Sequence, residues 1–530
     1  MRKYQQRKIL ESLQAIQEAQ SGGRYADCMD SALGICELIE QTEGNGTRAA
    51  ALLGEYCELL TKARNGEINR QALTRCLIKI KNSVRYELVP NRIEVVFFPY
   101  QLCMWDSMES IYLAAREDPR CDAFVAPIPW FERRPDGSFG KMHYDGDQYP
   151  ERIPVTDWRE YDVEARKPDA VFIHNPYDGN NFVSSVHPDY YSSELKKKTD
   201  FLVFIDYGLV YWMPKEPLVG NLLPAAIMSD LFVTYSKEYA DVMNFNLKHY
   251  VSAGTLPNQI LEKNSVAALG SPKFDAVINA KRGDLVLPDE WRKLMDGKIV
   301  MLYSTSVGAI LQGNENFISR HRAVLETFRN RDDIVLWWRP HPLSGATYAS
   351  MRPQFYVAYK NLTERYIAGG WGIYDDTPDL HRAIAWSDAC YSDESSLLFL
   401  YLATGKPFSV RTFAHTPEEC VTDGSTDFTQ ILDRQIWCMK EARGGNVFNH
   451  NVTIWWHNFV DANFVDNVRY DNFLDRFIHF VLNEADYPQA TLYRQLKLQM
   501  FQEFVENGDG TAGQKIYAFT KNKILGVTGT

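Results

Sequence analysis

The chain has 530 residues, more than one hydrophobic core usually serves, so the sequence predicts several domains. A composition of 45% hydrophobic and 24% charged residues is typical of a folded globular protein. The formal net charge of −11 argues against a general binder of nucleic acids or anionic membranes, because such proteins carry a basic surface.

The cysteines and the amino-terminal residues indicate an intracellular protein. The 9 cysteines form no CxxC pair, which is typical of reduced thiols in the cytosol. Met1-Arg2-Lys3-Tyr4 leads into an amphipathic pattern, whereas a signal peptide would continue into an apolar run. No stretch of about 18 apolar residues occurs, as a membrane span would require. We therefore expect a cytoplasmic protein.

Residues 1–88 are predicted to form a helical module. Apolar residues recur at helical spacing, as in Ile9, Leu13 and Ile16, and glycine-rich breaks separate the segments. Nothing in this pattern suggests chemistry. The module is expected to serve interaction, including homo-oligomerisation through these helices.

Strands and helices alternate from residue 89 onward. Strand-like runs lie at 93–98, 123–128, 170–173, 201–205 and 231–235, then at 266–269, 299–303, 334–338, 372–374, 389–391 and 408–410. Asp106 is expected to cap the first of the intervening helices. The alternation predicts two doubly wound lobes, residues 89–285 on the acceptor side and residues 286–425 on the nucleotide side. A helical extension, residues 426–530, is expected to pack on them.

Polar residues follow three strands of the second lobe, at the sheet edge where ligands of such folds bind. These residues are Ser304 and Thr305 after the first strand, Arg339 and His341 after the second, and Asp393, Ser395 and Ser396 after the third. Hydroxyls, a guanidinium, an imidazole and a helix N-terminus can all donate to a phosphate. Lys406, just before the next strand, is expected to add a positive charge.

Each of these signals has a structural alternative. Ser and Thr cap helices, a lone histidine caps a carbonyl in a turn, and Asp393 could be no more than an N-cap. Their combination at one edge of one sheet favours a diphosphate site.

Three residues of the first lobe are candidates for a general base. His174 and Asp206 each end a strand, and His187 follows His174 closely; any of them could take a proton from an acceptor hydroxyl, or could serve as a structural hydrogen-bonding group. The polar segment 131–149 suggests a lid or acceptor loop, since calcium-loop spacing is absent.

Three segments resemble a known family. They are Gly270-Ser271-Pro272-Lys273-Phe274-Asp275, Arg339-Pro340-His341-Pro342, and 387–396 continuing to Gly405-Lys406-Pro407. Their order and spacing are similar to those of the CDP-glycerol glycerophosphotransferases, which build teichoic-acid-type polymers in bacteria. The resemblance covers roughly residues 92–412 and is most specific in the second lobe.

The resemblance implies a GT-B-like α/β fold, with two doubly wound Rossmann-type lobes facing a cleft after the all-α amino-terminal module. CDP-glycerol would bind the second lobe. His341 would match the family histidine that contacts the donor diphosphate, and Ser395 and Ser396 would match its paired serines. An acceptor hydroxyl would attack the phosphorus that carries glycerol, and CMP would leave.

The sequence departs from the family pattern at two places. Where the family has a His-Gly pair that supplies the general base, this chain has Asp206-Tyr207-Gly208. Leu400 stands where family members often have aspartate. The base is therefore expected to be His174 or Asp206, with a slight preference for His174.

The predicted reaction transfers glycerol phosphate, or a similar alditol phosphate, from a CDP-linked donor to a polymer or lipid-linked acceptor. We expect no cofactor, no bound metal and no nucleic acid partner, and a location in the cytoplasm beside the inner face of the membrane. One alternative is a glycosyltransferase or epimerase that uses a UDP-sugar, with Glu394, Glu418 or Glu419 near the ribose. Another is a catalytically degenerate CDP-alditol-binding protein.

Overall fold

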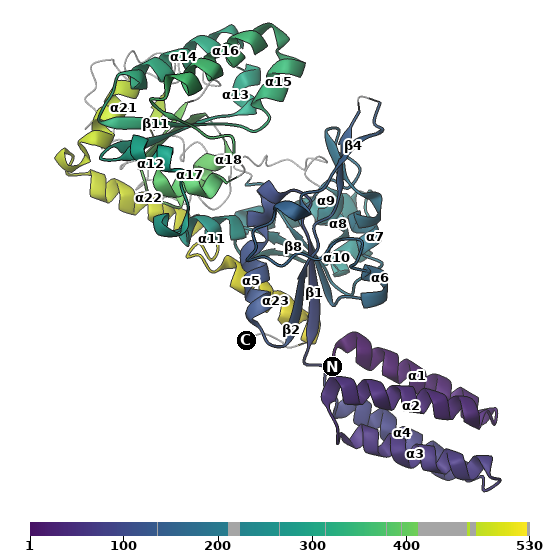
Figure 1. Cartoon of the computed structure of the whole chain (residues 1–530). Coiled ribbons are helices and arrows are strands. Elements are labelled where there is room, and N and C mark those ends of the chain that lie inside the picture. Colours follow the sequence, from purple (N-terminus) through teal and green to yellow (C-terminus); the bar gives the residue numbers. More distant parts are fainter. Residues whose placement is uncertain are drawn as a thin grey trace.

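The protein consists of a helical bundle followed by two α/β lobes (Figure 1). The computed structural model describes residues 1–134, 136–209, 223–263, 265–312, 314–377, 379–393, 395–411, 464–466 and 473–526. Glu394, Glu418 and Glu419 lie outside these residues, as does most of the predicted extension before residue 473. None of the helices in the described part of the chain is both long and apolar enough to cross a membrane.

The amino-terminal module is a bundle of four helices. Their bounds are α1 (Lys3–Ser21), α2 (Tyr25–Glu43), α3 (Arg48–Arg64) and α4 (Arg70–Tyr86). The apolar positions that predicted the helices form one buried core, which includes Ile9, Leu13, Ile39, Tyr56 and Ile80. Thr47 and Asn69 cap α3 and α4 by accepting from backbone N–H groups.

Arg2 joins the bundle to the first lobe. Its guanidinium is buried and forms ion pairs of 2.8 Å with Glu94 and with Asp169. Both carboxylates belong to the first lobe, so this contact crosses the junction. Because a buried charge is stable only when paired, the bundle is held against the lobe at this point.

The first lobe is built on a sheet of six parallel strands in the order β2-β1-β5-β7-β8-β9. The strands are β1 (Ile93–Phe98), β2 (Cys121–Val125), β5 (Ala170–Ile173), β7 (Leu202–Ile205), β8 (Leu231–Thr234) and β9 (Ser265–Ala268). Around the sheet run α5 (Glu109–Glu117), α6 (Val163–Arg166), α7 (Ser192–Leu195), α8 (Pro224–Met228), α9 (Lys237–Ser252) and α10 (Gln259–Lys263). Every pair in the sheet is parallel, as the alternation of strands and helices predicted.

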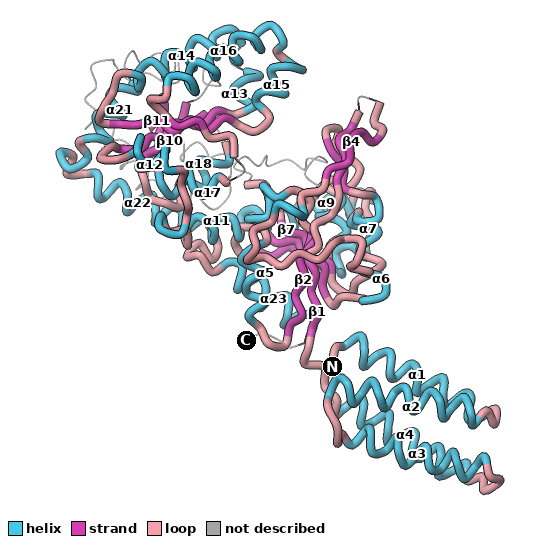
Figure 2. The backbone as a smooth tube through the Cα atoms, viewed as in Figure 1, coloured by secondary structure: helices cyan, strands magenta, loops and turns pink. Residues whose placement is uncertain are grey.

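A small antiparallel sheet stands out from this lobe (Figure 2). It has the order β4-β3-β6, from β3 (Trp130–Arg133), β4 (Phe139–His143) and β6 (Ser184–Val186). The sequence predicted only a polar lid or loop here. Short strands with polar residues on both faces give no clear alternation, so the pattern did not reveal them.

The second lobe repeats the parallel design with the order β12-β11-β10-β13-β14-β15. Its strands are β10 (Ile299–Thr305), β11 (Ile334–Pro340), β12 (Ile373–Tyr374), β13 (Ala389–Asp393), β14 (Phe408–Arg411) and β15 (Phe464–Asp466). Its helices are α12 (Asp289–Met295), α13 (Val307–Gln312), α14 (Asn314–Arg329), α15 (Ser344–Met351), α16 (Pro353–Gly369), α17 (Leu380–Trp386) and α18 (Ser396–Leu402). The predicted fold class, two doubly wound lobes after a helical module, is confirmed.

The carboxyl-terminal helices cover both lobes. Side chains of α21 (Phe473–Leu482) and α22 (Ala490–Phe504) enter the core of the second lobe, and those of α23 (Ala512–Leu525) enter the core of the first. In Figure 1, α23 lies beside α5 although the two are far apart in sequence. The strand β15 lies within the range predicted as helical, and it extends the second sheet by pairing with β14.

Helix α11 (Pro272–Ile278) forms the junction between the lobes. Phe274 packs edge-on against Phe399 of α18. The carboxylate of Asp275 accepts from the N–H groups of Ala512 and Gly513, at 3.0 and 2.7 Å, and so caps α23. Gly270 has φ +92°, a conformation that favours glycine, and an added Cβ would collide with the Glu506 carbonyl. The segment 270–275 therefore has a structural reason for its composition.

Candidate functional site

The strand order of the second sheet reverses at β10. The chain proceeds from β10 to β11 and β12 on one side, then places β13 on the other side. Ser304 at the end of β10 is aligned with Arg339 of β11 and with Ser392 of β13. The loops that follow these strands thus meet at the reversal point, where doubly wound sheets bind ligands.

A buried aspartate fixes the loop after β10. Asp393 is fully buried, and its Oδ2 accepts from the N–H of Ser306 at 3.0 Å. The hydroxyl of Ser306 in turn accepts from the N–H of Ala309 at 3.1 Å, which caps α13. Ser304 and Thr305 are buried beside this turn. Asp393 therefore holds the loop of its neighbouring strand, whereas we had expected it to face phosphate or to cap its own helix.

His341 is held with one ring nitrogen facing outward from its turn. Its backbone N–H donates to the carbonyl of Thr305 at 3.0 Å, and its Nδ1 accepts from the N–H of Leu343 at 3.1 Å. A neutral imidazole whose Nδ1 accepts must carry its proton on Nε2. Among the described residues Nε2 has no partner, and the side chain is exposed. Loss of hydration lowers the pKa of His341, which favours this neutral form.

Two serines begin the helix after β13. Ser395 is the N-cap of α18, and its hydroxyl is buried without a hydrogen-bond partner in the described part of the chain. Ser396 is the first helical residue and is exposed. The first N–H groups of a helix lack intrahelical acceptors, so this turn can donate to an anion.

Arg339 does not present its guanidinium to a ligand. It is buried in an ion pair with Asp375, Nη1 to Oδ2 2.8 Å, and Nη2 donates to the carbonyl of Thr377. Asp375 also accepts from the indole N–H of Trp337 at 3.0 Å. The predicted phosphate contact is replaced by a structural one, because the partner carboxylate lies on a loop that the sequence did not connect with Arg339.

Lys406 lies at the opposite edge of the sheet from these loops. It precedes β14, and in a parallel sheet the residue before a strand lies at the amino edge. Its ammonium donates to the carbonyls of Ile384, Ala385 and Ser387 at 2.9, 3.0 and 2.6 Å, which caps the end of α17. Burial, assisted by the nearby charge of Arg282, lowers the pKa of Lys406 to about 8. The predicted phosphate contact is corrected accordingly.

Replacing Lys406 by methionine should therefore destabilise the protein without weakening its binding of a nucleotide. Three carbonyls lose their charged donor, so we expect a loss of about 1–3 kcal/mol in the free energy of unfolding. Denaturant titration measures this loss, with Lys360→Met as the control because Lys360 and Glu364 form an exposed pair. The control should change stability by less than about 0.5 kcal/mol. A large fall in nucleotide affinity for Lys406→Met at unchanged stability would contradict the corrected assignment.

His174 is a structural residue of the first lobe. It is fully buried, its Nε2 accepts from the N–H of Tyr100 at 3.1 Å, and its Nδ1 lies 3.0 Å from the hydroxyl of Ser107. Burial lowers the pKa of His174 to about 3, and the charge of Lys273 acts in the same direction. With both nitrogens engaged inside the lobe, His174 is not available to an acceptor, contrary to our preference for it as the base.

Asp206 is better suited to accept a proton. It follows β7 and is partly exposed; Oδ1 accepts from the N–H of Gly208 and Oδ2 from the hydroxyl of Tyr239, both at 2.8 Å. Each oxygen keeps a second lone pair. Burial raises the pKa of Asp206, while these hydrogen bonds and the charge of Lys273 act the other way.

Asp106, Lys273 and His381, none of which the sequence predicted as a site residue, link the edges of the two sheets. Both carboxylate oxygens of Asp106 bind the ammonium of Lys273, at 2.6 and 2.7 Å, and Oδ2 lies 3.0 Å from Nε2 of His381. Asp106 lies in the 3-10 helix Leu102–Ser107 after β1, and His381 opens α17 in the second lobe. Asp106 is therefore not the N-cap that we predicted. Burial would raise the pKa of Asp106, but Lys273 and His381 hold it below its usual range.

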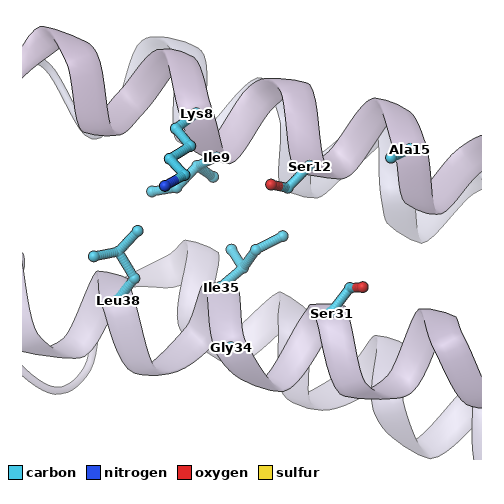
Figure 3. A pocket seen from close by; sticks show the side chains of 8 residues that line it. All are labelled: Lys8, Ile9, Ser12, Ala15, Ser31, Gly34, Ile35 and Leu38. Atoms are coloured by element: carbon cyan, nitrogen blue, oxygen red, sulfur yellow. The ribbon is translucent and has the colours of Figure 1, made fainter. Parts of the chain in front are cut away.

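A groove on the bundle lies outside this region (Figure 3). It has a volume of about 320 Å³ between α1 and α2, and Figure 3 shows Ile9 and Ile35 pointing toward one another across it. Its lining is mostly apolar or small, with Lys8 as its one charged side chain.

Within the residues that the structure describes, no group of His, Cys, Asp or Glu side chains could hold a metal ion.

No family model matches the sequence, and no curated protein matches it. Among solved structures, the wall teichoic acid polymerase TagF is 14% identical, with 91% of this chain and 98% of that chain covered and a TM-score of 0.44. A UDP-GlcNAc 2-epimerase from Neisseria meningitidis, bound to UDP-GlcNAc, is 13% identical, covering 82% and 100% of the two chains at a TM-score of 0.43. S. aureus MnaA, in a UDP co-structure, is 13% identical, covering 82% and 97% at 0.43.

Proposed function

We propose that the protein transfers glycerol phosphate, or a similar alditol phosphate, from a CDP-linked donor to a hydroxyl of a polymer or lipid-linked acceptor, releasing CMP. The observation that carries the proposal is the turn of His341, which directs a neutral Nε2–H outward where the loops after β10, β11 and β13 meet. A diphosphate needs such donors at a fixed point. The motif resemblance of residues 270–275, 339–342 and 387–407 supports cytidine as the nucleotide.

The donor diphosphate would lie between the turn of His341 and the start of α18. His341 donates through Nε2–H, and Ser395 and Ser396 add hydroxyls and free backbone N–H groups. Two buried contacts stabilise the loops that follow β10 and β11: the hydrogen bond of Asp393 with the N–H of Ser306, and the ion pair of Arg339 with Asp375. Pre-positioned donors of this kind are what in-line phosphoryl transfer chiefly needs from a protein.

The acceptor hydroxyl would be activated from the first lobe. Asp206 takes the hydroxyl proton as the acceptor oxygen bonds to the phosphorus that carries the alditol. The bond from that phosphorus to the oxygen of CMP breaks, and CMP leaves with the bonding pair. Such an acceptor would lie at the inner face of the membrane, and the protein would work beside it from the cytoplasm.

The direct test is to titrate CDP-glycerol, CDP, UDP and UDP-glucose into the protein by calorimetry, then to identify the nucleotide released in turnover by mass. Preference for the cytidine nucleotides and release of CMP are expected. Release of UDP from a UDP-sugar would establish the alternative glycosyltransferase or epimerase reading. Binding of CDP-glycerol with no turnover on any acceptor would leave a CDP-alditol-binding protein.

A further inference from the structure

The three-stranded sheet of β3, β4 and β6 carries an exposed apolar tip. Phe182 and Val183, just before β6, are 94% and 68% exposed, and Met142 and Phe139 of β4 are 52% and 37% exposed. The N–H of Arg133 donates to the carbonyl of Val183 at 2.9 Å, and Arg133 is aligned with Phe139. Because β3 lies between β4 and β6, the four side chains, here called the arm tip, lie at the two edges of this small sheet.

The arm tip gathers four large exposed apolar side chains on one small sheet. Single exposed apolar side chains are common, but a cluster of large ones marks an interaction surface. Phe131 stacks on Phe139 with ring centroids 4.8 Å apart, and the guanidinium of Arg133 covers the same ring at 4.8 Å. The ring of Phe139 is therefore partly covered, while Phe182, Val183 and Met142 are the more exposed members of the arm tip.

Cationic side chains stand beside the arm tip. Arg134 and Lys141 are exposed, as are the acids Glu132 and Asp136, and Glu132 lies 2.7 Å from Nε2 of His143. Residues 131–143 contain three Lys or Arg and two Asp or Glu, giving a formal charge of +1, in a chain of net charge −11. Charges farther away than a Debye length of roughly 8 Å at physiological salt are largely screened, so the arm can approach an anionic surface.

We propose that the arm tip inserts into the headgroup region of an anionic lipid bilayer. Figures 1 and 2 show the arm standing clear of the first lobe, on the side of that lobe that faces the second. A projecting apolar end flanked by cations suits a flat, negatively charged lipid surface, where apolar groups leave water and cations meet phosphate. This inference rests on the proposed function, because insertion of the arm tip would hold the two lobes close to a lipid-linked acceptor.

The test is flotation of the purified protein with vesicles of phosphatidylcholine, alone or mixed with phosphatidylglycerol. The wild type should bind the mixed vesicles more strongly. Phe182→Ser combined with Val183→Ser should weaken this binding by about tenfold or more, because two exposed apolar groups no longer insert. Arg134→Gln combined with Lys141→Gln should weaken binding to the mixed vesicles and reduce its sensitivity to salt.

Val286→Ser is the matched control, because Val286 is 76% exposed outside the arm. It should bind vesicles like the wild type, and circular dichroism should show all variants folded. Absence of wild-type vesicle binding, or binding that the double serine variant retains, would overturn the proposal. A dimer that the serine variant dissociates, without vesicle binding, would identify a protein interface instead. The same variants should keep the wild-type affinity for CDP-glycerol, so a failure here is separable from a failure of the proposed function.

Discussion

Replacing His341 by alanine should lower the affinity for CDP-glycerol by about 10- to 100-fold, while leaving the fold intact. A hydrogen bond to a charged group contributes roughly 1.5–3 kcal/mol, and its donor here is held in one direction by the bond from Leu343 to Nδ1. The side chain is exposed, so its removal leaves no buried cavity. Calorimetric titration of the donor, with thermal unfolding of the same sample, measures both effects.

Two further variants sharpen this result. His341→Asn keeps an N–H donor on a shorter side chain and should recover part of the affinity. His249→Ala removes an exposed histidine from α9 of the first lobe and should bind like the wild type. Since partial loss of hydration in its turn lowers the pKa of His341, the ring donates as a neutral group, and the affinity should stay level from neutral to mildly alkaline pH. Unchanged affinity of His341→Ala would show that the diphosphate lies elsewhere.

The layout of the two lobes could be predicted because each long strand is a continuous apolar run that can be recognised from its own residues alone. Runs such as Ile299–Thr305 and Ile334–Pro340 are continuous and buried, as strands covered on both faces are. The residues after such strands can then be assigned to one edge of the sheet, which is why the sequence placed Ser304, His341 and Ser395 at the same edge. The short antiparallel arm and the three-residue strand β15 gave no comparable signal.

The type of a residue does not reveal whether its side chain is already bound to another side chain inside the fold, so several predicted site residues turned out to be engaged in structural contacts. Arg339 and His174 have partners that are distant in sequence, Asp375 for the former and Tyr100 with Ser107 for the latter. The same limit concealed Asp106, whose partners come from both lobes. The error at Lys406 was avoidable from the sequence. Lys406 precedes a strand, and in a parallel sheet the residues before a strand lie at the edge opposite to the predicted phosphate site.

The Asp206→Asn variant should lose turnover while keeping its affinity for the CDP-linked donor. Loss of a positioned general base costs about 10²- to 10⁴-fold in kcat, whereas the donor contacts belong to the second lobe and should give an affinity within about twofold of wild type. The carbonyl oxygen of asparagine can accept from the N–H of Gly208 while its amide group donates to the hydroxyl of Tyr239, so the local fold should persist. Steady-state CMP release with the donor titration separates the two quantities. Turnover near the wild-type rate would exclude Asp206 as the base.

The pH profile of kcat tests the same residue in a way that a merely structural role would not reproduce. A base must be deprotonated, so the rate should fall as pH falls through the pKa of Asp206, which burial raises above the ordinary carboxyl value. The hydrogen bond from Tyr239 lowers that pKa, and Tyr239→Phe removes this bond. Tyr239→Phe should therefore move the acidic limb to higher pH while keeping a measurable rate. An unmoved limb would mean that the limb belongs to another group, and that the acceptor proton leaves by a different path.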